Sequence, residues 1–244
     1  MSDVKAALRT LNLFELFAKQ RQPLVLSDLS EQLDIPSSSC LQLIRTLLQH
    51  GYLYQTSKRG GYYPTLRLFD CVQAIVTHDS VNARVLPALT ALRDETGETV
   101  TLGKMQGRQL IYLLVLDSPH LLRPAIMSGM LRPLHSTGSG KALLGTMEPK
   151  ERKAILRAAG MARLTPFTVT SSAKLEQLLA EGAERGWHVN RGEGAIDLAS
   201  VAASVMIAGE PYAIAVIGPI SRLPSDVGHA TALLKAKAAI EQPA

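Results

Sequence analysis

The residues between Pro36 and Gly51 have the most distinctive pattern of side chains that could take part in chemistry. Small or flexible hydrogen-bonding groups recur there at helical spacing, and they share one side of a helix whose other side is apolar. Such groups can bond to base edges and phosphates in a major groove of DNA. The predicted chemistry is therefore reversible hydrogen bonding to nucleic acid. The candidate reading residues are Ser37, Ser38, Ser39, Gln42, Arg45 and Thr46.

Two helices and the turn between them must position these groups. Ser27 is expected to cap a first helix, which ends at Ile35 because Pro36 disfavours helical backbone in the residue before it. The serines after Pro36 offer new caps, and Gly51 ends the second helix. The apolar stripe of that second helix is predicted to consist of Leu41, Ile44, Leu47 and Leu48.

A short basic hairpin follows the second helix. Residues 52–55 and 62–65 are predicted to be strands, and Gly60-Gly61 allows the tight turn between them. Lys58 and Arg59 are expected at the tip, where cations can contact a phosphate backbone. Any small helical subdomain with a solvated basic loop would share part of this pattern. The agreement of helix order, turn and hairpin favours a winged helix-turn-helix that binds double-stranded DNA.

The chain length and composition predict a second domain. With 244 residues, 46% of them apolar, the chain exceeds one typical domain of roughly 100 to 150 residues. The formal net charge of +5 suits an anionic partner but does not establish one. We predict a winged helix-turn-helix domain over residues 1–66, a linker helix over 67–80, and a second domain over 81–244.

The second domain is predicted to mix helices and strands, which makes the fold class α+β with two domains. Helices are expected at 82–96, 137–146, 149–159, 172–185 and 225–241. Strands are expected at 99–105, 109–117, 121–127, 199–207 and 212–218.

Several other functions find no support in the residues. Cys40 and Cys71 are the only cysteines, no apolar segment is long enough to span a membrane, and no secretion signal is evident, so a cytoplasmic location without membrane contact is expected. The six histidines lack metal-site spacing, and no Gly-x-Ser-x-Gly elbow occurs. We therefore predict no catalytic residue, no metal and no cofactor.

A glycine-rich segment could be mistaken for a nucleotide-binding loop. Residues 138–141 resemble the end of a Walker A motif, which requires a further glycine five residues before Gly140 and a serine or threonine after the lysine. Those two positions hold His135 and Ala142. The spacing argues against nucleotide binding.

Longer motifs make the chain resemble the IclR family of transcriptional regulators. Residues 133–144 read PLHSTGSGKALL, close to that family's PLHATAxGKALLA signature. Residues 186–189, 201–203 and 218–222 then match a Gly-Tyr-Ala-Val element, an Ile-Ala-Ala strand and a Gly-Pro-x-x-Arg turn in the same order. The resemblance implies a winged helix-turn-helix, a linker helix and a GAF/PAS-like effector domain. Members act as dimers or tetramers that repress or activate operons in response to a small metabolite.

The resemblance also implies which residues bind the effector. Gly138 and Ser139 begin the helix that lines the pocket in this family. The opposite wall departs from the family pattern, because Asn190 replaces an acidic residue, Ser200 replaces a cysteine, and Ala215 and Ile217 replace two serines. That wall is poorer in hydrogen-bonding groups, which favours a more apolar or aromatic effector. These positions could instead only repack a core, with the pocket elsewhere.

Arg132 lies just before the Pro-Leu-His motif, where the family's pocket residue is usually apolar. If its side chain points inward, its forked donors could hold a carboxylate. The hypothesis is an aromatic or other partly apolar carboxylate as effector. Two alternatives remain at this point: an enzyme fused to a DNA-binding head, or a winged helix used for protein contacts.

Overall fold

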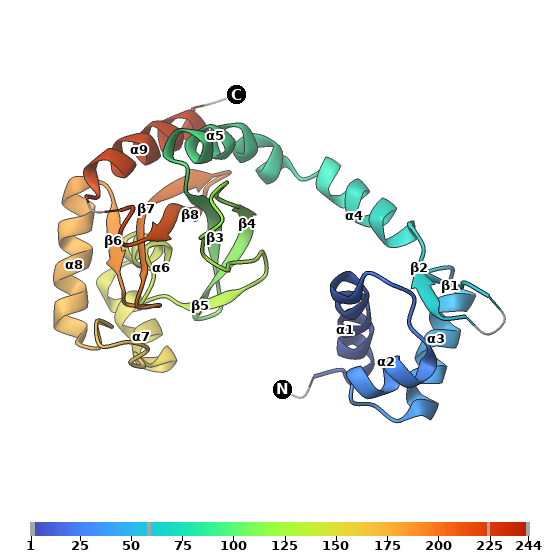
Figure 1. Cartoon of the computed structure of the whole chain (residues 1–244). Helices are drawn as coiled ribbons and strands as arrows, with labels where there is room; N and C mark the ends of the chain where they lie inside the picture. The colour runs from blue at the N-terminus through green and yellow to red at the C-terminus, as the bar shows by residue number, and fades with distance from the viewer. Residues whose placement is uncertain (1–2, 58–59, 224, 243–244) are drawn as a thin grey trace. The chain divides into compact units, whose positions relative to one another are not determined.

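The computed structural model describes residues 3–57, 60–223 and 225–242 of the chain. The backbone divides into two compact units, Met1–Asp79 and Ser80–Ala244, whose elements are labelled in Figure 1. The predicted α+β class is confirmed, because helices dominate the first unit and a six-stranded sheet forms the centre of the second. No helix in the described part of the chain is long and apolar enough to span a bilayer.

The amino-terminal unit is a winged helix-turn-helix, as predicted. Its core joins Leu13 and Phe17 of the first helix to Leu29, Ile44 and Leu53 of the following elements. A two-stranded antiparallel hairpin comes after the third helix. The elements are α1 (Lys5–Gln20), α2 (Leu26–Gln32), α3 (Ser37–Gln49), β1 (Leu53–Gln55), β2 (Tyr62–Pro64) and α4 (Arg67–Thr77).

The expected helix caps are wrong in detail. Helix α2 starts earlier than predicted, with Val25 as its N-cap, so Ser27 lies inside the helix and its hydroxyl bonds to the Asp28 carboxylate. Pro36 takes the N-cap position of α3, and no side chain caps that helix. The backbone angle that proline fixes is compatible with a helix start, so no serine cap is required.

The second unit folds around one antiparallel sheet. Its strand order is β5-β4-β3-β8-β7-β6, and every neighbouring pair is antiparallel. The helices are α5 (Ser80–Thr96), α6 (Gly138–Gly145), α7 (Pro149–Ala159), α8 (Ser172–Arg185) and α9 (Val227–Glu241). The strands are β3 (Thr99–Gln106), β4 (Gln109–Leu116), β5 (Leu131–Pro133), β6 (His188–Arg191), β7 (Leu198–Ile207) and β8 (Glu210–Pro219).

Helices cover both faces of this sheet (Figure 1). Helices α5 and α9 pack with Val201 and Val216 in one apolar cluster, whereas α6, α7 and α8 pack with Ala202 and Ala215 in another. Successive side chains of a strand point to opposite faces, so neighbours in sequence fall in different clusters. Ser200 and Ile217 therefore face the α6 side of the sheet.

The expected strand at 121–127 is wrong. These residues form a loop between β4 and β5 in which Leu121 is 99% exposed. Pro119 and Pro124 lack the N–H that a strand donates to its neighbours, which accounts for the loop. The short strands β5 and β6, which the sequence pattern did not indicate, form the two edges of the sheet instead.

Candidate functional site

The exposed face of α3 presents the side chains expected to read DNA. Cys40, Ile44 and Leu47 turn to the core, which leaves the other side of the helix to solvent. Five of the six helix candidates are exposed, and Ser39 is half-buried. The exposed candidates are Ser37, Ser38, Gln42, Arg45 and Thr46.

Among the exposed candidates, the side chains of Ser38, Gln42 and Arg45 have no partner in the described residues. The Thr46 hydroxyl donates to the Gln42 carbonyl at 3.0 Å, and the Ser37 hydroxyl lies 3.0 Å from that of Ser30. Neither the amide of Gln42 nor the guanidinium of Arg45 has a hydrogen-bond or ion-pair partner within the described residues. A long amide and a cation are thus available one helical turn apart. Lys58 and Arg59, expected at the tip of the hairpin, lie outside the described residues.

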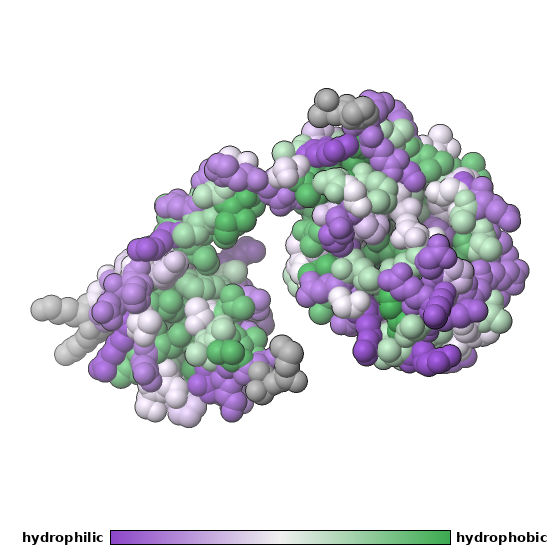
Figure 2. Space-filling view, turned by 180° about the vertical axis from the view of Figure 1, so that it is seen from behind, coloured by the Kyte–Doolittle hydropathy of each residue, from purple (hydrophilic) through white to green (hydrophobic). Residues whose placement is uncertain are grey.

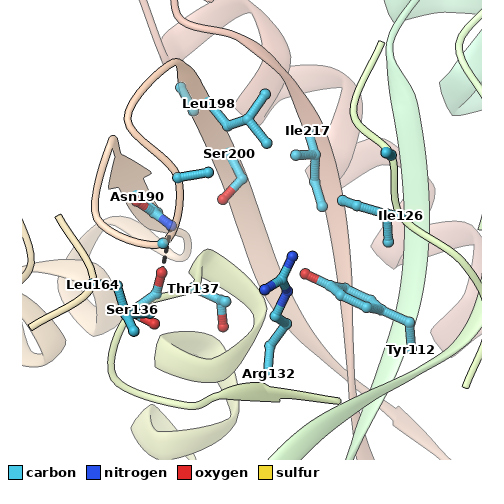
Figure 3. A pocket seen from close by; sticks show the side chains of 14 residues that line it. Tyr112, Ile126, Arg132, Ser136, Thr137, Leu164, Asn190, Leu198, Ser200 and Ile217 are labelled. Atoms are coloured by element: carbon cyan, nitrogen blue, oxygen red, sulfur yellow. Dashed lines mark hydrogen bonds between the residues drawn. The ribbon is translucent and has the colours of Figure 1, made fainter. Parts of the chain in front are cut away.

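A cavity opens in the carboxyl-terminal unit on the α6 side of the sheet (Figure 3). Its volume is about 70 Å³. On the same measure, one water molecule needs roughly 10–15 Å³. The cavity therefore suits a small organic molecule. The lining residues are Tyr112, Ala125, Ile126, Arg132, Ser136, Thr137, Leu164, Asn190, Gly194, Ala195, Leu198, Ala199, Ser200 and Ile217.

Arg132 and Tyr112 form the strongest donor group of the cavity. They come from the neighbouring strands β5 and β4, and Figure 3 shows the guanidinium and the phenol hydroxyl pointing toward one another inside the cavity. Neither group has a hydrogen-bond partner among the described residues. Burial raises the pKa of Tyr112 to about 12, an effect that nearby Arg132 opposes, so the phenol stays protonated and can donate. This corner can bind an anion.

The rest of the lining is mostly apolar, with a polar edge. Ile126, Leu198 and Ile217 supply aliphatic surface. The Ser200 hydroxyl points into the same space (Figure 3), and the Asn190 amide donates to the Ser136 carbonyl at 2.7 Å. A ligand that places a carboxylate beside Arg132 would lay its body against the aliphatic wall.

The predicted effector residues fall into two groups. Arg132, Asn190, Ser200 and Ile217 line the cavity. Gly138, Ser139 and Ala215 do not: all three are buried, where α6 packs against the sheet. The Ser139 hydroxyl is buried without a partner in the described structure.

Sequence reasoning missed Tyr112, the first two residues of β7 and the loop residues of the lining. Tyr112 has the same strand parity as buried Leu110, so an aromatic ring with a polar tip at an inward position was an available signal. Ala125, Leu164 and Gly194 carry no such signal, because their place depends on how loops fold over the sheet.

His188 of β6 is a buried histidine outside the cavity lining. Its burial should make the stability of the fold depend on pH. Its ring lies against α8, where a Cβ on Gly182 would come within 2.2 Å of the imidazole Nδ1. Burial, together with Arg185 and Lys141, lowers the pKa of His188 to about 4. The unfolded chain, with a pKa of about 6.5, binds the proton more readily. Stability is therefore complete above about pH 6.5 and falls as the pH drops toward about 4.

We expect the free energy of unfolding to fall by about 2 kcal/mol between pH 7.5 and pH 5 because of His188. Urea unfolding at the two pH values measures the change. His188→Gln should flatten this pH dependence, whereas substitution of the exposed His120 by glutamine should leave it intact. An unchanged slope in His188→Gln would contradict the assignment.

Comparison with known proteins matches both units. A family model described as the IclR helix-turn-helix domain matches residues 6–57, and a model described as the carboxyl-terminal part of the bacterial transcriptional regulator IclR matches residues 73–242. The transcriptional repressor IclR of Escherichia coli K12 is 29% identical over 227 residues, which cover 91% of this chain and 83% of that protein. The E. coli K12 repressor AllR is 29% identical over 202 residues, covering 82% and 74%.

Solved structures share the fold along nearly the whole chain. The crystal structure of Thermotoga maritima IclR matches with a TM-score of 0.80 and 19% identity, covering 98% of each chain. An IclR homologue of Microbacterium hydrocarbonoxydans, solved in complex with 4-hydroxybenzoate, matches with a TM-score of 0.76 and 20% identity over 97% of each chain. At these identities the likeness concerns the fold.

Proposed function

Because this chain belongs to the IclR family of bacterial transcriptional regulators, we propose that its regulatory signal is a small, partly apolar carboxylic acid bound in the cavity beside Arg132. The family consists of DNA-binding regulators with an effector domain rather than of enzymes. The proposal therefore concerns which effector binds, which residues read the operator, and how two copies of the chain associate.

The guanidinium of Arg132 is the observation that carries the effector proposal. It points into a cavity with no hydrogen-bond or ion-pair partner in the described residues, while the wall around it is largely aliphatic. A carboxylate would give this cation two parallel hydrogen bonds, and Tyr112 could donate a third. An aromatic or branched body would bury apolar surface against Ile126 and Ile217. The M. hydrocarbonoxydans homologue was solved with 4-hydroxybenzoate, an acid of this class.

A panel of ligands tests this proposal. Benzoate, 4-hydroxybenzoate and branched aliphatic acids should bind to the purified full chain in calorimetry and weaken its hold on its own promoter DNA. Benzamide, which has the same shape without the charge, should bind much more weakly. The effector proposal fails if short hydroxyacids bind better than every aromatic or branched acid.

An effector acts on DNA binding only through a difference in affinity between two states of the protein. We infer that one arrangement of the regulator binds operator DNA and that acid in the cavity changes its population. Operator DNA lies in the bacterial cytoplasm, so we infer the same location for the regulator.

We propose that Ser38, Gln42 and Arg45 on the exposed face of α3 read the operator. Arg45→Ala should reduce affinity for the operator about tenfold, because one good contact from arginine to a guanine is worth roughly 1–3 kcal/mol. Fluorescence anisotropy with labelled promoter DNA measures this affinity. Effector affinity should not change, and Arg157→Ala in the other unit is the matched control. Normal operator binding by Arg45→Ala would remove this residue from the reading face.

We also propose that two copies of the chain associate through α4. Leu66 and α4 residues Phe69, Val72 and Val76 recur at intervals of three and four, and all four are exposed, from 49% at Val72 to 75% at Leu66. Figure 2 shows apolar surface in the region of this helix. A helix that exposes an apolar stripe is typical of a helix that pairs with a second copy. Two copies would present two reading helices to a palindromic operator.

A further inference from the structure

A buried lysine lies behind the wall of the effector cavity. Lys141 of α6 is 1% exposed and does not line the cavity. Its ammonium donates to the Val189 carbonyl at 3.1 Å and forms an ion pair with the carboxylate of Glu193, which is 7% exposed. The side chain therefore ties α6 to β6 and to the turn that follows it.

That turn and the last two residues of β6 together form segment 190–195, which builds one side of the cavity. Residues 190–195 supply three of the lining residues: Asn190, Gly194 and Ala195. Within this segment, the Glu193 backbone N–H donates to the Asn190 side-chain oxygen at 3.0 Å, and the Asn190 side-chain amide donates to the Ser136 carbonyl. The backbone of Glu193 thus helps to orient a side chain that lines the cavity.

The turn is also held from its other side. The Thr168 hydroxyl donates to the Glu193 carbonyl at 2.7 Å, and the Thr165 hydroxyl donates to the Gly192 carbonyl at 2.6 Å. A Cβ added to Gly194 would approach the Ser136 carbonyl to 2.8 Å. The turn therefore packs closely against the cavity wall, and a small displacement would change the shape of the site.

The ion pair is not expected to add much to the free energy of unfolding. Two buried charges lose their hydration, so an apolar pair of similar volume is often as stable. One carboxylate oxygen of Glu193 has no partner in the described structure, which leaves part of that loss unrecovered. An apolar pair would not define the angle at which the turn meets α6. The hydrogen bonds of the ion pair do, because they are directional.

We propose that Lys141 and Glu193 are positioning residues, whose ion pair fixes segment 190–195 in the conformation that binds effector. This inference takes the cavity as the effector site from the proposed function. Neither residue contacts the effector; both act through Asn190, Gly194 and Ala195. With the pair intact, the turn is ordered before the effector arrives, and binding does not have to order it.

The double variant Lys141→Met/Glu193→Gln tests the proposal. It leaves no buried charge, so it should retain a folded effector domain even if Lys141→Met alone does not. We expect its affinity for 4-hydroxybenzoate in calorimetry to be roughly three- to tenfold weaker than that of the wild type, since the turn must now be ordered on binding. In the ligand-free full chain, amides 190–196 should exchange hydrogen for deuterium faster than in the wild type.

A second, partly buried ion pair provides the control. Arg152, 8% exposed, pairs with Glu176 and donates to the Leu144 and Met147 carbonyls, and none of these residues lines the cavity. Arg152→Met/Glu176→Gln should alter stability without changing ligand affinity or exchange at 190–196. The proposal is overturned if hydrogen exchange at amides 190–196 stays at the wild-type rate in Lys141→Met/Glu193→Gln, or if it rises equally in the control variant. Because exchange needs no ligand, it decides the question even if no acid binds the wild type.

Discussion

Arg132→Ala is expected to lower the affinity for benzoate-like acids about 100-fold and to abolish their effect on operator binding. Charge-assisted hydrogen bonds contribute roughly 1.5–3 kcal/mol each, and a carboxylate deprived of its cation in a largely apolar cavity keeps its desolvation cost. Operator affinity without ligand should stay at the wild-type value, since the proposed DNA readers belong to the other unit. Calorimetry and anisotropy on the same preparation measure the two affinities.

Two further variants sharpen this test. Arg132→Lys keeps the charge without the planar fork, so it should recover only part of the affinity. Arg108→Ala removes an exposed arginine that lies outside the cavity lining and should bind the acid normally. Unchanged acid binding in Arg132→Ala would remove the guanidinium from the site and with it the effector class proposed above.

Phe69→Glu should convert the regulator to monomers and reduce operator affinity roughly 1000-fold, toward the level of non-specific binding. Phe69 lies in the centre of the apolar stripe on α4, so a second copy would bring two carboxylates together in an apolar seam. A single reading helix contacts only one half-site, and the second half-site then adds nothing to the affinity. Analytical ultracentrifugation gives the mass, and anisotropy gives the affinity.

Ala74→Glu is the matched control for that variant. Residue 74 is exposed on the same helix but five positions from Phe69, about 140° around the helix axis at 3.6 residues per turn. It adds the same charge away from the stripe and should leave both the mass and the DNA affinity unchanged. A Phe69→Glu protein that remains dimeric would exclude this stripe as the interface.

The DNA-binding unit could be predicted closely because its signals are local. Pro36 and Gly51 fix the ends of α3 to within a residue or two, and the polar face follows from helical periodicity. Helix α1 shows the limit of this reasoning. Its apolar residues occur all around the helix, and Leu11 is 62% exposed, whereas Leu13 and Phe17 are buried. Periodicity cannot choose between two apolar faces.

The cavity could be predicted only in part because it is a product of topology. Ser200 and Ile217 lie opposite one another on paired strands, and Arg132 precedes a recognisable motif, so single segments carried these signals. Tyr112 and Asn190 lie on strands separated by three others in the sheet order. The loops that complete the lining are placed by long-range hydrogen bonds, such as those from Thr165 and Thr168 to the turn after β6. No local pattern encodes those contacts.

The division of the chain near Asp79 separates two kinds of molecular recognition. Every candidate reader of DNA that the structure describes precedes this point, and every residue that lines the cavity follows it. Mutations in the cavity can therefore change which metabolite binds without changing which operator sequence is recognised. Mutations in α3 can likewise change the operator without changing the metabolite. A regulator built in this way can be passed between metabolic pathways by exchanging one contiguous gene segment.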